Sequence, residues 1–565
     1  MQLRATPALT HEASAAVRVA IGLVLVGLAA YVAAFFYCAA CRLTFPFDLE
    51  WMEGGMLTHS ARLLRGEPIY ASPSSDFVAF FYTPLYARVV AVLSQVTGGL
   101  SFTVGRAVSL VSTVATFAML FHAGRREAGW LAGVVAVGLY AALFRTVGTF
   151  FDLARIDALA LALGFGASLV AYEVRTTRGA MAAALLFVLA FFTKQTAAVV
   201  APFVGLHLLM VDRRRAMVFG VVGAIFGIAL GVFEDAASRE WFRFYVIQGH
   251  QGHSFYWRNF VLEYWRDLLF LCPFVVLVPT LGASYGKRTR WAVVAFLGLL
   301  VVAFAQRVGT LAYDHHMYFS DLWYENPRWR LVVPPTAMAT LLIAVRVLGA
   351  KIPLPSPYFL WLCVGGAFAS GLNHSTQWAY SNCFMPVAVY ASLYAALVFA
   401  KGVEHTATSG GRLGAVAFAG ALLVQLVALV YDPRMQVPRG ADWRALAEFE
   451  RVLARFPGPV FVPAHPMYSY LRDGTVHMHQ MGIGDVAFAG GIVDLSARLA
   501  SGAFPTVVQD TDCAIAGLAE SHVAVHRFQY DGLAFLLRTG FAVRPATVWV
   551  HRDILAKRPE LRSVP

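Results

Sequence analysis

The chain has 565 residues, of which 58% are hydrophobic and only 14% charged, and its mean hydropathy is +0.62. Soluble globular proteins contain about 45–50% apolar and about 25% charged residues, so this composition excludes a soluble enzyme, a disordered protein and a nucleic-acid-binding protein. It predicts a polytopic α-helical membrane protein. The formal net charge of +12 is then explained by basic loops that hold the spans in place at the cytoplasmic face.

Membrane spans need about 20 mostly apolar residues each. The first such run extends from about Val17 to Cys41, and it lacks the small-residue cleavage context of a removed signal peptide, so we expect a retained helix. Twelve further apolar runs follow, which makes about 13 predicted transmembrane helices. They lie near residues 103–123, 128–147, 157–174, 180–193, 195–211, 216–233, 267–285, 291–305, 331–348, 357–372, 383–400 and 413–430.

The basic residues of the short connections fall at alternate loops, and one orientation accounts for all of them. It places the N-terminus in the cytoplasm and the C-terminus outside, which predicts a bacterial inner (plasma) membrane protein with a long first external loop, 42–102. It also requires that Leu85–Val96, which follows Pro84 and contains Arg88, lies along the membrane surface instead of crossing it. The connecting residues are Arg125, Arg126, Arg175, Arg178, Arg213, Arg214, Arg215, Lys287, Arg288, Arg290, Lys351, Lys401 and Arg412.

The composition changes after Val430. Residues 431–565 carry 14 Lys or Arg and 13 Asp or Glu, about one residue in five, against about one in eight before them. Short β-like runs alternate there with a helical pattern over Trp443–Phe456. We therefore predict a membrane domain over residues 1–430 and a small external (periplasmic) α/β domain over 431–565. The predicted strands are Pro459–Val462, Thr506–Val508, His522–His526 and Thr547–Val550.

Three acidic residues, Asp48, Glu50 and Glu53, lie within six positions just after the first span. A solvated loop with interfacial aromatic residues would have the same composition. Two features favour a binding site instead. An amphipathic segment over Met56–Leu64 carries Arg62. Its helical pattern then ends, and a cluster of aromatic side chains follows. The pattern ends at Gly66-Glu67-Pro68-Ile69-Tyr70, and the aromatic cluster is Phe80-Phe81-Tyr82-Thr83-Pro84.

A second charged cluster, Asp152, Arg155 and Asp157, lies where the chain enters the fourth predicted span. Charges at the end of a span are costly unless they are paired or functional. One interpretation is a local ion pair between Arg155 and either aspartate. Asp157 is also expected near a helix N-terminus, where a carboxylate is favoured. The predicted orientation puts this cluster on the same side of the membrane as Asp48.

Lys194 stands alone between two short apolar segments at the external boundary, followed by Gln195 and Thr196. A lysine that extends its ammonium group to the membrane surface is the simplest interpretation. An ammonium group beside amide and hydroxyl donors would also suit a phosphate held at that surface.

Together these segments resemble the GT-C superfamily of integral-membrane glycosyltransferases, whose bacterial members are related to protein O-mannosyltransferases and lipid A aminoarabinose transferases. The resemblance covers roughly residues 15–215. It does not extend to the oligosaccharyltransferase type, because the C-terminal region has no Trp-Trp-Asp-Tyr-Gly-like motif. The matching segments are Asp48-Leu49-Glu50-Trp51-Met52-Glu53-Gly54, Gly66-Glu67-Pro68-Ile69-Tyr70, Tyr82-Thr83-Pro84-Leu85-Tyr86, Arg155-Ile156-Asp157 and Lys194-Gln195-Thr196.

The resemblance implies a hexosyl- or pentosyltransferase that moves a sugar, with inversion, from a polyprenyl-phosphate donor to a glycan, lipid or protein acceptor of the cell envelope. Such a reaction needs a carboxylate that takes the acceptor proton and cations that stabilise the leaving phosphate. Asp48 is the predicted base and Glu50 the second choice. Lys194 and Arg155 are the predicted phosphate ligands. The other predicted substrate-binding residues are Glu53, Arg62, Tyr82, Asp152 and Asp157.

No metal is expected to be obligatory, although Asp48 or Glu50 with Asp152 or Asp157 would offer oxygen ligands to a divalent cation. The external histidine pairs lack a third ligand at a convincing spacing. Two other functions remain open: a ligase or assembly protein for surface polysaccharide, and a secondary transporter. A transferase should show a groove from the bilayer to Asp48, and a transporter a central cavity. The histidine pairs are His250 and His253, His315 and His316, and His477 and His479.

Overall fold

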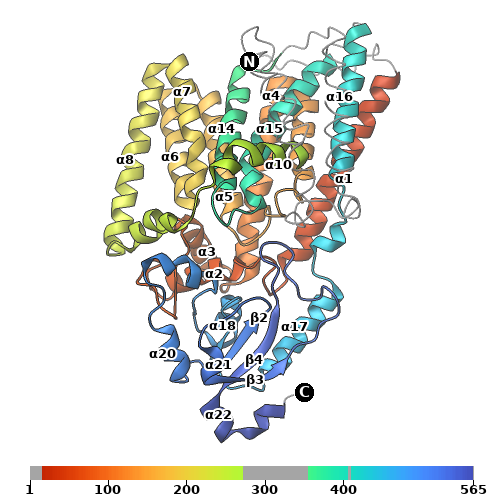
Figure 1. Cartoon of the computed structure of the whole chain (residues 1–565). Helices are drawn as coiled ribbons and strands as arrows, with labels where there is room; N and C mark the ends of the chain where they lie inside the picture. The colour runs from red at the N-terminus through yellow and green to blue at the C-terminus, as the bar shows by residue number, and fades with distance from the viewer. Residues whose placement is uncertain (1–14, 272–353, 405–408, 564–565) are drawn as a thin grey trace.

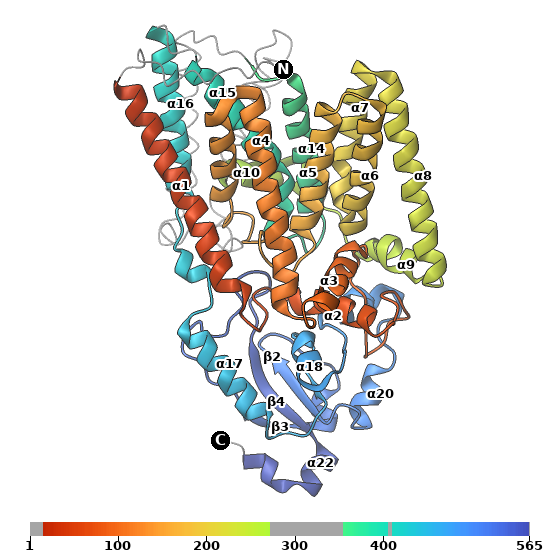
Figure 2. The same ribbon diagram turned by 180° about the vertical axis from the view of Figure 1, so that it is seen from behind.

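The computed structural model describes residues 15–271, 354–404 and 409–563. A bundle of long helices lies at one end of the molecule, and a smaller part with a β-sheet lies at the other end (Figure 1). Helix α1 (Ala15–Leu43) runs the length of the bundle and ends beside the sheet-containing part, as the two opposite views show (Figures 1 and 2). Helix α16 (Ser409–Ala428) packs along α1.

Four helices within the described residues are long and apolar enough to cross a membrane, and a bent pair of helices would make a fifth. These long apolar helices define an integral membrane protein. The predicted spans near 267–285, 291–305 and 331–348 lie wholly or largely outside the described residues. The four helices and the bent pair are Ala15–Leu43, Phe102–Ala142, Arg213–Ala237, Ser381–Glu404, and Gly414–Ala428 with Pro433–Leu453.

Helix α4 (Phe102–Ala142) contains two of the predicted spans, because its backbone breaks sharply at Ala128 and Gly129. Gly129 has a φ of +79°, a conformation that favours glycine. The segments on either side of the break touch: a Cβ atom on Gly124 would lie 2.8 Å from the backbone of Ala132. Glycine at this position lets the two segments approach so closely.

Several helices in the described part are shorter than the about 20 residues of an ordinary span, so the number of predicted spans is only partly reproduced. Helix α3 (Leu85–Val96) has 12 residues and a length of about 18 Å, too short to cross the roughly 30 Å hydrocarbon core. This length agrees with the surface position predicted for Leu85–Val96, which stays a prediction. The other helices of the bundle are α5 (Asp157–Glu173), α6 (Thr177–Thr193), α7 (Ala201–Val211), α8 (Arg213–Ala237), α9 (Trp241–Arg243), α10 (Tyr264–Leu271), α14 (Pro357–His374) and α15 (Met385–Glu404).

The C-terminal part contains a four-stranded mixed sheet in the order β1-β2-β4-β3. Strand β1 pairs in parallel with β2, whereas β4 pairs antiparallel with both β2 and β3. All four predicted strands are present, and the predicted helix over Trp443–Phe456 corresponds to α17 (Gly440–Leu453). The strands are β1 (Val460–Phe461), β2 (Thr506–Asp510), β3 (His522–Arg527) and β4 (Pro545–His551), and the remaining helices are α18 (Pro466–Asp473), α19 (Met481–Asp485), α20 (Leu495–Ala500), α21 (Leu518–Ser521) and α22 (Arg552–Lys557).

The first loop lies between the helical bundle and the C-terminal part (Figure 2). Its helix α2 (Glu53–Leu64) packs on α3 at one side and on α18 of the C-terminal part at the other. Nine of the twelve residues of α2 are buried. The acidic segment that precedes α2 is therefore enclosed by elements from both ends of the chain.

Candidate active site

The acidic segment of the first loop is a buried turn between α1 and α2. Each of its three carboxylates accepts a hydrogen bond from a backbone N–H of the same segment. Side chains that bond to nearby backbone in this way hold the turn, and themselves, in one orientation. The donor and acceptor pairs are Gly54 with Asp48 (2.6 Å), Leu49 with Glu53 (2.7 Å) and Met52 with Glu50 (3.1 Å).

Glu53 forms a fully buried ion pair with Arg106 of α4, with N–O distances of 2.7 and 2.9 Å. Arg106 also donates to the carbonyl groups of Phe45 and Phe47, and Glu53 accepts from the N–H of Ala154 at 2.7 Å. Burial raises the pKa of Glu53, but Arg106 and the backbone donors outweigh it and hold this pKa below its usual value. These contacts brace the turn against α4 and the loop before α5, so we assign Glu53 a structural role.

Glu50 points to the other side of the turn, where it meets Arg155. Its Oε2 lies 3.2 Å from Nη1 of Arg155, and both side chains are buried. Arg155 also donates to the hydroxyl of Tyr82 at 3.3 Å and lies over the ring of Tyr82. The predicted residues Glu50, Arg155 and Tyr82 are thus in direct contact, although 105 positions separate the first two.

Asp157, the first residue of α5, continues this line of charges. Its Oδ2 lies 3.9 Å from Nε of Arg155, and its Oδ1 accepts hydrogen bonds from Lys194 at 2.6 Å and from Asn382 at 2.9 Å. Lys194 follows the last residue of α6 and is partly exposed. Four charges of alternating sign therefore run from the acidic turn to the lysine: Glu50, Arg155, Asp157 and Lys194.

The pKa of Glu50 is raised to about 8, chiefly because its carboxylate is buried. Arg155 lowers it, whereas the nearby carboxylates raise it further. The pKa of Arg155 is raised, because Glu50 and Tyr82 overcome the effect of its burial, so this guanidinium stays charged. A carboxylate whose pKa lies near neutral is suited to accept a proton and to release it again.

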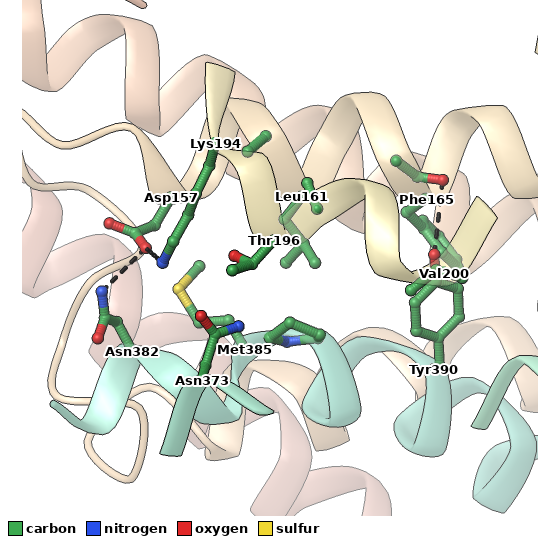
Figure 3. Close-up of a pocket in the computed structure, with 14 residues that line it drawn as sticks. Asp157, Leu161, Phe165, Lys194, Thr196, Val200, Asn373, Asn382, Met385 and Tyr390 are labelled. Atoms are coloured by element: carbon green, nitrogen blue, oxygen red, sulfur yellow. Dashed lines mark hydrogen bonds and ion pairs between the residues drawn. The ribbon is translucent and has the colours of Figure 1, made fainter. Parts of the chain in front are cut away.

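A pocket begins at Lys194 and Asp157 and extends between α5, α14 and α15. Its two ends differ in chemistry. Lys194, Asp157 and Asn382 lie at one end, and Phe165, Val200 and Tyr390 lie at the other (Figure 3). The polar end suits an anionic head group, and the apolar end suits a hydrocarbon chain. The remaining lining residues are Ala160, Leu161, Gly164, Thr196, Ala197, Asn373, Met385 and Pro386.

Asp48, Glu50 and Arg155 do not line this pocket themselves. Asp48 is fully buried, and its Oδ2 is 2.9 Å from Nδ1 of His465 in the C-terminal part. The other ring nitrogen of His465 is 2.8 Å from Oδ2 of Asp510. Burial lowers the pKa of His465, but the two carboxylates overcome this and raise it to about 10, so the imidazole is protonated at neutral pH.

Two further predicted ligands lie outside this line of contacts. Asp152 is buried and pairs with Arg42 at 3.1 Å instead of with Arg155. Arg62 pairs with Glu67 at 3.0 Å and donates to the carbonyl of Pro68. These contacts connect Asp152 and Arg62 to the protein scaffold, and neither residue lines the pocket.

Within residues 15–271, 354–404 and 409–563, no group of three or more His, Cys, Asp or Glu side chains is arranged so that it could hold a metal ion. The carboxylates proposed as possible metal ligands are instead each paired with a different cation. Among the histidines, Nε2 of His479 bonds to the carbonyl of Trp51, and His253 lies 3.5 Å from Asp485. His315 and His316 lie outside the described residues.

The structure brings the three charged segments together through the contacts of Glu50, Arg155, Asp157 and Lys194. Sequence reasoning missed three residues that hold this site: Arg106, Asn382 and His465. Arg106 lies inside a predicted span, where a buried arginine is costly enough to suggest a role. Asn382 and His465 carry no such signal, since their partners are 225 and 417 positions away.

The fold and these buried charges define an integral membrane protein with a polar site between its helical bundle and its C-terminal sheet. No protein-family model matches the sequence, and no curated protein matches it. The chain is similar to the solved structure of ArnT from Cupriavidus metallidurans in the apo state, with a TM-score of 0.48 and 14% identity over 96% of this chain and 99% of ArnT.

The structure of ArnT bound to undecaprenyl phosphate matches with a TM-score of 0.44 and 16% identity, over 94% of this chain and 98% of that one. The oligosaccharyltransferase from Archaeoglobus fulgidus in the apo form matches with a TM-score of 0.44 and 12% identity, over 86% of this chain and 69% of that one. The two ArnT alignments cover nearly the full chain. At 12–16% identity the similarity assigns no residue role and no substrate to this protein.

Proposed function

We propose that this protein is an inverting glycosyltransferase that moves a sugar from a polyprenyl-phosphate donor to a cell-envelope acceptor at the external face of the membrane. The observation that carries the proposal is the pocket with Lys194 and Asp157 at its polar end and mostly apolar side chains along the rest of it. A phosphate at Lys194 would place the attached hydrocarbon among the apolar residues. The reacting sugar would then lie towards Arg155 and Glu50.

Of the two predicted bases, we assign proton transfer to Glu50. It contacts Arg155 and so belongs to the line of charges that reaches the pocket, and its raised pKa of about 8 suits a general base. Asp48 has both oxygens engaged, by Gly54 and His465, and neither hydrogen bond belongs to that line of charges. Asp48 is therefore proposed to support the turn.

In the proposed reaction the acceptor hydroxyl attacks the anomeric carbon, its proton passes to Glu50, and the bond between that carbon and the phosphate oxygen breaks. The donor phosphodiester carries one negative charge, and the leaving phosphate monoester carries up to two. The four charges Glu50, Arg155, Asp157 and Lys194 sum to zero before the step. Protonation of Glu50 leaves a net charge of +1 as the phosphate gains its negative charge, which stabilises the transition state.

We further propose that no metal is obligatory, because Arg155 and Lys194 supply the positive charge near the phosphate. Transfer should then persist after exhaustive chelation with EDTA. Loss of transfer on chelation and its recovery with Mg²⁺ or Mn²⁺ would contradict this part of the proposal.

A secondary transporter is less well supported. Transporters bind their substrates near the bilayer midplane, often at unwound helix segments. Here Asp157 is the first residue of α5 and Lys194 follows the last residue of α6, so the polar end of the pocket lies at helix ends. A polysaccharide ligase would use the same kind of donor and differs in the size of the group transferred.

Mass analysis of surface glycans tests the proposal most directly. A deletion strain should lack one defined sugar modification, the wild-type gene should restore it, and a Glu50→Gln gene expressed at the same level should not. Glycans of unchanged mass in the deletion strain, together with no release of polyprenyl phosphate by the purified protein, would contradict a transferase. Loss of a whole polymer chain instead of one sugar would favour the ligase.

A further inference from the structure

His465 joins the C-terminal part of the chain to the acidic turn through a fully buried contact. The side chains of Asp48 and His465 both have 0% exposure, and so does that of Asp510 on the other side of the imidazole. The ring of Phe47 lies against the imidazole with a centroid distance of 4.4 Å. The protonated imidazole is therefore enclosed between two carboxylates, and removal of the imidazole would leave both carboxylates buried without their cation.

Local structure on the C-terminal side holds this imidazole in place. His465 immediately precedes α18, and Met467 of α18 lies so close to the turn that a Cβ atom on Gly54 would meet its Cβ at 3.1 Å. Asp510 ends β2 at an irregularity of the pairing with β4, between Gln509 and Asp510. Such an irregularity redirects a side chain away from the regular alternation of a strand.

The contact between His465 and Asp48 is linked to Glu50 through the backbone of the acidic turn. Asp48 accepts the N–H of Gly54, and Glu50 lies between these two residues. The C-terminal part also touches the turn directly: the N–H of Arg538 donates to the carbonyl of Leu49 at 2.9 Å, and Glu50 forms a β-bridge with Thr539. The backbone that carries Glu50 is thus fixed from both of its sides by residues of the C-terminal part.

We infer that His465 is a positioning residue of the active site: held by Asp510, it fixes Asp48 and thereby orients the turn that presents Glu50 to the acceptor. The inference rests on the proposed function, and it gives the C-terminal part a role in catalysis. His465 does not touch the substrate. Its effect should therefore fall on turnover and not on donor binding, which depends on Lys194.

The test compares two substitutions that each keep part of the imidazole's hydrogen bonding. His465→Asn can still donate to Asp48 from the position of Nδ1, whereas His465→Gln extends towards Asp510 and loses Asp48. We expect His465→Gln to lower kcat by about 10- to 100-fold with little change in the KM for the polyprenyl-phosphate donor, and His465→Asn to retain more activity. Should His465→Gln fail to insert, Asp510→Asn supplies a second variant, expected to lower kcat in the same way.

Ser75→Ala is the matched control. Ser75 also joins the first loop to the C-terminal part, through Asp494 at 2.6 Å and Arg498 at 2.8 Å, but these residues lie away from the turn. The control should keep kcat within about twofold of the wild type. An equal loss in the control, a loss confined to donor KM, or full turnover in His465→Gln would overturn the positioning role.

A measurement without substrate separates this inference from the proposed function. The shifts in thermal unfolding midpoint caused by Asp48→Asn and His465→Gln should be non-additive in the double variant, because each removes the same interaction. Additive shifts would overturn the contact itself. If the wild-type protein transfers no sugar but the shifts are non-additive, the proposed function fails, and the positioning role in catalysis fails with the proposed function. The coupling between Asp48 and His465 would still stand.

Discussion

Nη1 of Arg155 lies 3.2 Å from Oε2 of Glu50, in a buried contact between the loop that enters α5 and the turn that leaves α1. This contact joins the two halves of the proposed chemistry. Glu50 belongs to the acidic turn, and Arg155 leads through Asp157 to Lys194 and the pocket. A proton accepted at one end is therefore electrostatically linked to a phosphate bound at the other.

Replacing Glu50 by glutamine should nearly abolish transfer. A general base typically contributes about 10²–10⁴-fold, so we expect kcat to fall by that factor while the KM for the lipid donor changes little. Sugar transfer by purified protein in detergent measures both constants. Asp48→Asn is the comparison, and we expect it to retain more turnover than Glu50→Gln. The opposite order would return the role of base to Asp48.

Removal of the Lys194 ammonium group should weaken donor binding. A charge-assisted hydrogen bond of the kind expected here corresponds to about a tenfold or larger change in affinity, so Lys194→Ala should raise the dissociation constant of undecaprenyl phosphate by at least that much. Equilibrium binding of the labelled lipid in detergent measures this. Lys401→Ala, at the end of α15, is the control for loss of a lysine. If the wild-type protein bound undecaprenol, which lacks the phosphate, as tightly as undecaprenyl phosphate, Lys194 would recognise no head group.

Gly540 should be intolerant of even a single methyl group. A Cβ atom there would lie 2.8 Å from Oε1 of Glu50, and its φ of +80° is unfavourable for other residues. We expect Gly540→Ala to lower kcat by about 10- to 100-fold through displacement of Glu50. Gly490→Ala controls for the backbone strain, because Gly490 has a φ of +95° and open space around it. Similar kinetic losses in both variants would exclude a specific effect on Glu50.

The folded protein should lose stability at alkaline pH through His465. The pKa of His465 is raised from 6.5 to about 10 in the folded protein, so its contribution is fully present below pH 6.5 and is lost as the pH rises towards 10. Thermal unfolding from pH 6 to 10 should show a fall in the wild type that is smaller in His465→Asn. Parallel curves for the two proteins would mean that the imidazole is not held in its protonated form.

The transfer reaction itself should depend on Glu50 in its ionised form. Because burial raises this pKa to about 8, the rate of transfer should increase with pH up to that region and not level off near the ordinary value of 4.5. The initial rate as a function of pH measures this, and in Glu50→Gln the residual rate should lack the same rise.

Composition and hydrophobic periodicity were sufficient for the membrane class, the four strands and the short helix over Leu85–Val96, because these depend on the local pattern of apolar residues. The charged segments at 48–53, 152–157 and 194 also stood out, since charges beside apolar runs are costly. Local pattern was insufficient for the number of spans, because a short or broken helix differs little in composition from a full span.

The partners of these charges were decided by the tertiary structure alone. Arg155 had two nearby aspartates in sequence, yet it pairs most closely with Glu50, and Asp152 pairs with Arg42. Asp48 matched the expected base by its position, but folding buried it against His465 from the far end of the chain. Which carboxylate of the turn contacts Arg155 depends on how distant segments pack around that turn, and no local pattern in a single sequence records that packing.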